Sequence, residues 1–314
     1  NRMRELAGVW IAGGSNTYGG YAEDDEVFSA VLRKYGIWAA NIASEGHSVP
    51  SQAATIQLLA KENNQPTAVI LVLSMYFAIA DYSVDLQKLE YMSVGNFKIA
   101  TDPPTARTKL LNTVTEFAGA FPASFHSVRV RLLHSSALYG WFKVGIMGVP
   151  ALREWTLRRG LRADLDVVRN YDTNLLKPLS DDNPASTLIG STADYVLAMK
   201  KMVERKLGVP FGVVILPSHH QLHPAAFQRF VSHYGLSGQD LDPLRPLTAL
   251  HRALEDRQVR TLDTFPALHA SGIPRLTFPD DGHLTAKAHA IVAKRLAQWI
   301  KIGMPLQPEK STVK

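Results

Sequence analysis

The feature that most constrains the fold is a regular alternation along the first 75 residues. Short apolar runs at 9–12, 37–42 and 68–74 are typical of strands, and they alternate with amphipathic segments at 24–35 and 52–62 that are typical of helices. This order predicts βα units and a mainly parallel sheet. The third run, A-V-I-L-V-L-S, is almost wholly apolar, as expected of a strand whose two faces are both covered by helices.

The same kinds of segment return in the last third of the chain. We expect helices at 193–207, 247–257 and 286–302, and strands at 211–216 and 259–262. Together with the N-terminal units, they predict an α/β fold with three α/β/α layers around a parallel sheet of about five strands.

The middle of the chain departs from this pattern. The stretch from about 82 to 208 is too long for a simple βα crossover, and we interpret it as a helical insertion in a single domain, 1–303, followed by a mobile tail at 304–314. Its basic, aromatic part at 128–162 suggests peripheral contact with an anionic membrane. The favoured alternative is a solvated helix face packed on the core, because Gly and Pro interrupt the amphipathic pattern.

Composition excludes several classes of function. The 314 residues carry a formal net charge of +6 with a pI near 9.4, but Lys and Arg are dispersed and no nucleic-acid-binding motif appears, so we expect no nucleic-acid partner. The absence of cysteine excludes disulfides, thiolate metal sites and a cysteine nucleophile. Because the chain begins at Asn1, we expect that an upstream segment has been removed and favour a periplasmic or secreted location over the cytoplasm.

A glycine-rich turn carrying Ser15 follows the first apolar run. Its glycines lack the G-x-G-x-x-G spacing of a dinucleotide site, and Gly20 and Tyr21 stand where a P-loop needs Lys and Ser or Thr. The remaining chemical interpretation is a serine nucleophile, which requires a base, an orienting carboxylate and donors to the oxyanion. The turn alone favours the alternative, a helix-capping serine.

The segment at 278–289, F-P-D-D-G-H-L-T-A-K-A-H, supplies the missing groups. Asp280 and Asp281 precede His283 by three and two residues, just ahead of a helix start at Thr285. At this spacing one carboxylate can accept from the imidazole N–H and leave the other ring nitrogen free to take a serine proton. The alternative is that both aspartates solvate a turn and His283 is an ordinary loop histidine.

Together the two ends of the chain resemble the SGNH hydrolases, also called GDSL-type esterases and lipases. G-G-S-N-T-Y-G at 13–19 is similar to the family's first block, and D-D-G-H at 280–283 to its last. The resemblance implies Ser15 as nucleophile, His283 as base and then acid, and Asp281, or else Asp280, as the residue that orients His283. It also implies an oxyanion hole formed by the backbone N–H groups of Ser15 and Gly46, without metal or organic cofactor.

Two positions depart from the family pattern. Gly14 replaces the aspartate beside the nucleophile, and no asparagine follows the third strand, where the family supplies an oxyanion donor. Ser74 or Tyr76 is the expected replacement donor. The missing asparagine keeps open an alternative class, a catalytically inactive carbohydrate-binding or scaffold protein of a polysaccharide assembly system.

Histidines after two strands are candidates for contact with the substrate. His219 and His223 are four residues apart, as in some zinc sites, but no H-E-x-x-H glutamate accompanies them and flanking prolines disfavour a regular helix. Substrate contact or plain surface exposure is therefore favoured over metal binding for His219 and its neighbour His220. His47, directly after Gly46, is expected to border the site.

The sequence thus predicts a serine ester hydrolase or an O-acyl (acetyl) transferase that works through an acyl-serine intermediate. The expected substrate is a small ester or an acylated carbohydrate, such as a polysaccharide. Hydrolysis and transfer share the first half-reaction and differ in whether water or a sugar hydroxyl accepts the acyl group.

Overall fold

The computed structural model describes most of the chain apart from its middle. The described residues are 8–19, 22–43, 49–61, 65–75, 90–94, 97–101, 173–180, 183–233, 236, 238–278 and 282–304. They belong to one compact unit, formed by the segments 1–101 and 169–314.

A five-stranded sheet forms the centre of this unit. Its strands, in the order β2-β1-β3-β6-β7, are all parallel. They span Ala39–Asn41 (β2), Gly8–Gly13 (β1), Pro66–Ser74 (β3), Phe211–Leu216 (β6) and Thr261–Asp263 (β7). The order confirms the predicted parallel sheet. Because the chain runs outward from β1 to β2 and then returns to β3 on the other side of β1, the sheet has its topological switch point between β1 and β3.

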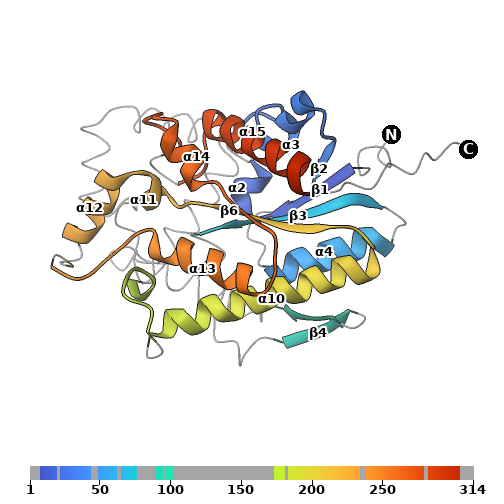
Figure 1. Cartoon of the computed structure of the whole chain (residues 1–314), viewed down its shortest axis with the longest axis horizontal. Helices are drawn as coiled ribbons and strands as arrows, with labels where there is room; N and C mark the ends of the chain where they lie inside the picture. The colour runs from blue at the N-terminus through green and yellow to red at the C-terminus, as the bar shows by residue number, and fades with distance from the viewer. Residues whose placement is uncertain are drawn as a thin grey trace, which may run out of the picture. The chain divides into compact units, whose positions relative to one another are not determined.

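One face of the sheet is covered by the helices nearest the two ends of the described chain (Figure 1). These are α3 (Phe28–Val31), the 3-10 turn η1 (Leu32–Tyr35), α14 (Phe265–Ala270) and α15 (Ala286–Gly303). Val9 and Ile11 of β1 point into this layer and pack with Leu296 of α15.

The opposite face is covered by α4 (Val49–Lys61), α10 (Pro184–Lys206) and α13 (Arg245–Asp256) (Figure 1). Trp10 and Ala12, which alternate with Val9 and Ile11 along β1, face this second cluster. Since successive strand residues point to opposite sides, a strand buried between two helical layers must be apolar at every position. All six residues of β1 and of β6 are buried. The predicted three-layer α/β/α class is confirmed.

Several elements differ from the sequence-based expectation. The helix expected at 24–35 begins only at Phe28, and it tightens into η1 before Gly36 ends it in a left-handed conformation. Helix α10 begins at Pro184 rather than near 193 because Asn183 caps it and proline suits a first helical turn. It packs on α13 and α4. A helical insertion, which stays a prediction, would therefore end before Pro184.

The range for which we expected that insertion also contains strand. β4 (Glu90–Val94) and β5 (Phe97–Thr101) pair as an antiparallel hairpin. Residues 102–172, including the basic stretch at 128–162, lie outside the described residues, as does the tail from 305.

Two helices follow β6 that the sequence patterns did not predict. They are the single turn α11 (His219–Leu222) and α12 (Pro224–His233), and a 3-10 turn, η4 (Thr173–Leu176), precedes α10. In the described part of the chain, no helix has both the length and the apolar character needed to cross a membrane.

Candidate active site

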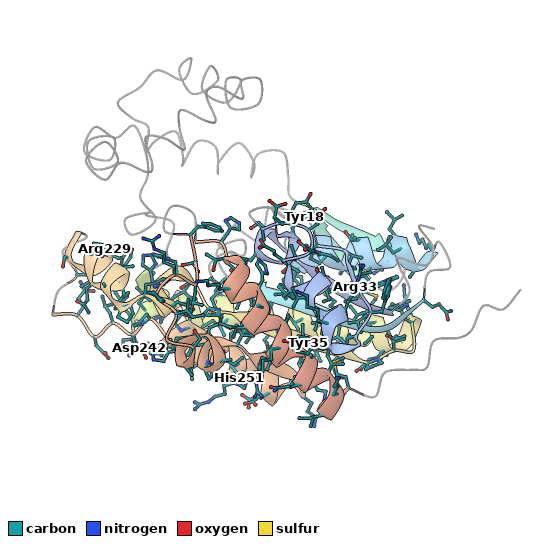
Figure 2. The ribbon with its side chains drawn as sticks, turned by 90° about the horizontal axis from the view of Figure 1, so that it is seen from above. Tyr18, Arg33, Tyr35, Arg229, Asp242 and His251 are labelled. Carbon is teal, nitrogen blue, oxygen red and sulfur yellow. The ribbon has the colours of Figure 1, made fainter. Side chains whose placement is uncertain are left out.

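Ser15 is the first residue of a one-turn helix, α2 (Ser15–Tyr18), that follows β1 after Gly14. It is half-buried, and Tyr18 at the other end of the turn is 51% exposed and extends from the ribbon in Figure 2. Gly13 allows the tight fit of this turn, because a Cβ there would lie 2.2 Å from Oγ1 of Thr17. The strand thus ends at the carboxyl edge of the sheet with the hydroxyl of Ser15 just beyond it.

Carboxamide side chains from separate elements brace this serine turn. Gln52 of α4 donates from Nε2 to the carbonyl of Gly13. Asn41, at the end of β2, donates from Nδ2 to the carbonyl of Thr17 (2.9 Å). Asn16, inside the turn, is the third. The bonds from Gln52 and Asn41 fix the backbone directly beside and within α2. The position of Ser15 is therefore set by neighbouring elements as well as by its own short helix.

Asn16 joins the two ends of the chain. Its Oδ1 accepts a hydrogen bond from the backbone N–H of Leu284 (2.9 Å), and its Nδ2 donates to Oγ of Ser74 at the end of β3 (3.3 Å). Ser15 directly precedes Asn16, and His283 directly precedes Leu284. The serine turn and the histidine loop, 268 positions apart, therefore meet at the β1–β3 switch point.

His283 lies on a hairpin-like loop just before α15. Thr277 and Leu284 form an isolated antiparallel bridge, and the N–H of Phe278 donates to the carbonyl of His283 (2.8 Å). Gly282 has φ +73°, a conformation that glycine adopts without strain, and its N–H donates to the carbonyl of Phe278 (2.8 Å). These bonds fix the described residues on either side of 279–281 to one another.

Several predicted site residues lie outside the described residues. They are Asp280 and Asp281, which precede His283 in the sequence, Gly46 and His47 after β2, and Tyr76 after β3. Their roles stay predictions. Ser74 is described: it ends β3, is half-buried and contacts Asn16.

Two histidines that follow β6, His219 and His223, contact Thr277 at the start of the same loop. Nδ1 of His219 and Nε2 of His223 lie 2.7 Å and 2.9 Å from Oγ1 of Thr277, a residue only 2% exposed. The prolines do not prevent a helical turn here, because α11 ends at Leu222 and His223 follows it just before Pro224. One turn is enough to place both rings on the same side, and the two ring centroids lie 4.6 Å apart.

His220 points elsewhere. It is 5% exposed, and its ring centroid lies 5.2 Å from that of Phe230 in α12, so it belongs to the packing of α12. This burial shows that the alternative of plain surface exposure is wrong for His220, whereas a substrate contact stays a prediction for both His219 and His220. Among the described residues, no group of three or more His, Cys, Asp or Glu side chains is arranged to hold a metal ion.

His289 of α15 is a buried histidine next to this site. Its Nδ1 accepts from the backbone N–H of Phe28 (3.3 Å), and the two rings stack with centroids 5.5 Å apart. Burial, and secondarily the charge of His283, lowers the pKa of His289 to about 4. At neutral pH this ring is therefore uncharged, and Nδ1 serves as an acceptor that anchors the start of α3.

Comparisons with known proteins found similarity among solved structures. No protein-family profile and no curated protein sequence matches the chain. A member of the lipolytic protein G-D-S-L family from Veillonella parvula is 10% identical, with 94% of this chain and 98% of that chain covered and a TM-score of 0.44. A catalytic mutant of an acetylxylan esterase from Geobacillus stearothermophilus is 11% identical, with 96% of both chains covered and a TM-score of 0.40.

The fold and the site share one arrangement. The sheet, with its strands in the order β2-β1-β3-β6-β7, lies between two helical layers. The serine turn directly follows β1, and the histidine loop directly precedes α15. This chain has a three-layer α/β/α architecture, with the serine turn and the histidine loop at the carboxyl edge of its sheet.

Proposed function

We propose that the protein is a serine ester hydrolase or O-acyl transferase with Ser15 as its nucleophile. The observation that carries this proposal is the hydrogen bond from the N–H of Leu284 to Oδ1 of Asn16. It brings the residue before Leu284, His283, to the turn that begins at Ser15. A serine reacts as a nucleophile only with a base in hydrogen-bond reach, and we propose His283 as that base.

The proposed reaction has two matched halves. Oγ of Ser15 attacks the acyl carbonyl carbon while His283 takes its proton, and the alcohol then leaves with that proton as its C–O bond breaks. Water or a sugar hydroxyl attacks the acyl-serine in the same way and releases Ser15. Asp281, or Asp280, accepts from the second ring nitrogen and stabilises the imidazolium.

The oxyanion hole draws on Ser74 in this proposal. Oγ of Ser74 accepts from Nδ2 of Asn16, and a hydroxyl that accepts still has its own proton to donate. Ser74 ends β3, where the family supplies its asparagine, and so it replaces that donor beside the backbone N–H groups of Ser15 and Gly46. Tyr76 is the second candidate. Each such donor contributes a factor of about 10² to 10³ in turnover.

The proposed substrate is a small acyl ester, with acetyl on a carbohydrate as the favoured case. His47 and His219 are the side chains that we propose to border it. A carbohydrate-binding protein without turnover is the second candidate, and the absence of an asparagine after β3 is the observation that favours it.

The deciding experiment measures hydrolysis of p-nitrophenyl acetate by the wild type, Ser15→Ala and His283→Gln. We expect Ser15→Ala to abolish turnover and His283→Gln to lower it by about 10² to 10⁴. The exposed His269 provides a matched control, because His269→Gln should leave turnover unchanged. Equal rates for the wild type and Ser15→Ala would refute the enzymatic proposal. With an acetylated oligosaccharide, free acetate indicates hydrolysis and an acetylated second sugar indicates transfer.

A further inference from the structure

We propose that Asn16 is a positioning residue, which locks the serine turn and the histidine loop into one catalytic unit. The inference rests on the proposed acyl-transfer function and adds a residue to its machinery. It starts from a single carboxamide that bonds two distant segments, the loop at Leu284 and the end of β3 at Ser74.

The chemistry of the side chain suits this task. A carboxamide offers an acceptor and a donor on one rigid plane, and Asn16 uses both on partners that come from other elements. It is 7% exposed, so solvent cannot readily replace either bond. Loss of the side chain would leave the buried N–H of Leu284 without this acceptor, which is costly in a protein interior.

The other two braces of the turn do not reach the loop. Gln52 ties Gly13 to α4, and Asn41 ties Thr17 to the end of β2. Both bonds hold the turn against elements from the N-terminal part of the chain. The bond from the N–H of Leu284 to Asn16, in contrast, joins the backbone beside His283 to the turn that begins at Ser15.

The bond to Ser74 extends the same role to the third strand. Because Nδ2 of Asn16 occupies one lone pair of Oγ of Ser74, it restricts the rotation of that hydroxyl and orients its proton. Asn16 thereby supports Ser74, the proposed oxyanion donor that takes the place of the asparagine missing after β3.

Two substitutions separate positioning from mere packing. Asn16→Ala removes both bonds. Asn16→Asp keeps an acceptor for the N–H of Leu284, but its other carboxylate oxygen takes the single proton of the Ser74 hydroxyl, which then no longer serves the oxyanion. The carboxylate also adds a negative charge near His283, which favours a protonated imidazole.

The matched control is Asn183, a second buried asparagine that uses both ends of its amide. It accepts from the N–H of Ala185 and donates to the carbonyls of Asn174 and Pro178, around the start of α10. Asn183→Ala should therefore cost stability of the same kind while leaving kcat unchanged.

The experiment measures kcat, KM and the pH profile for p-nitrophenyl acetate, together with hydrogen exchange at the amide of Leu284. We expect Asn16→Ala to lower kcat about 10- to 100-fold with KM changed less than about threefold, and to speed exchange at Leu284. Asn16→Asp should keep exchange at Leu284 near that of the wild type but also lower kcat, because the Ser74 proton is engaged, and it should move the acid limb of the profile about one unit toward higher pH.

The outcomes distinguish this inference from the proposed function. If Asn16→Ala loses stability but keeps wild-type kcat, as expected of Asn183→Ala, Asn16 is only a packing residue and the inference fails. Unchanged exchange at Leu284 in Asn16→Ala overturns the inference as well. So does an unshifted pH profile in Asn16→Asp. Failure of the proposed function shows separately, as equal activity of the wild type and Ser15→Ala.

Discussion

The backbone N–H of Phe28, the first residue of α3, donates to Nδ1 of His289 in α15 across 3.3 Å. This bond joins the helix that follows the serine turn to the helix that follows the histidine loop. It requires an unprotonated Nδ1, and burial provides that state by lowering the pKa of His289 to about 4.

Acid should therefore weaken the fold at His289. Its folded pKa lies below the ordinary value of 6.5, so the unfolded chain binds more protons between these values and stability is lost as pH falls from 6.5 toward 4. The total loss from this residue is about 3 kcal/mol. Urea unfolding at stepped pH measures it in the wild type and in His289→Gln. An equally steep decline in both would show that other groups cause it.

The hydroxyl of Thr277 should hold the histidine loop in place. Thr277→Val removes the contacts with His219 and His223, and we expect it to cost about 1–3 kcal/mol of unfolding free energy and to lower kcat. Thr277→Ser keeps the hydroxyl and should recover most of both losses. Chemical denaturation and ester hydrolysis provide the two readouts. If Thr277→Val keeps wild-type stability and kcat while Thr277→Ser loses them, the methyl group rather than the hydroxyl matters at this position.

The two adjacent glycines before Ser15 should respond very differently to an added methyl group. A Cβ at Gly13 would lie 2.2 Å from Oγ1 of Thr17 and 3.0 Å from the carbonyl oxygen of Val72, whereas a Cβ at Gly14 has no neighbour within 4 Å. Gly13→Ala should cost about 1–3 kcal/mol through overpacking. Gly14→Ala, at φ −88°, should be nearly neutral. Thermal melts of the pair test this, and similar melting temperatures would contradict the tight packing of the turn.

The sequence predicted the layered fold well because both of its signals are local. The central strands β1 and β6 are apolar runs set by burial on both faces, and helices such as α15 show a clear amphipathic period. Of the helices that it missed after β6, α12 has ten residues, whereas α11 and α14 are short. Six-residue α14 and one-turn α11 span too few residues to show a period.

The candidate site was predictable in its main residues and not in its supports. Motif resemblance selected Ser15 and His283, which are adjacent in sequence to the two ends of the Asn16–Leu284 bond. The roles of Asn16 and Thr277 depend on partners 268 and 54 to 58 positions away, and no local pattern encodes such pairs. Asn16 stood beside the predicted nucleophile, and the missing asparagine after β3 was the signal that could have drawn attention to it.

The central claim, that Ser15 carries the acyl group, is tested most directly by trapping the intermediate. The protein is mixed with p-nitrophenyl acetate, quenched in acid within the first turnovers, digested and examined by mass spectrometry. We predict one added acetyl group on Ser15 in the wild type and none at that peptide in Ser15→Ala. Release of p-nitrophenol at the same rate from both proteins, with no acetyl group on Ser15 in the wild type, would contradict the account.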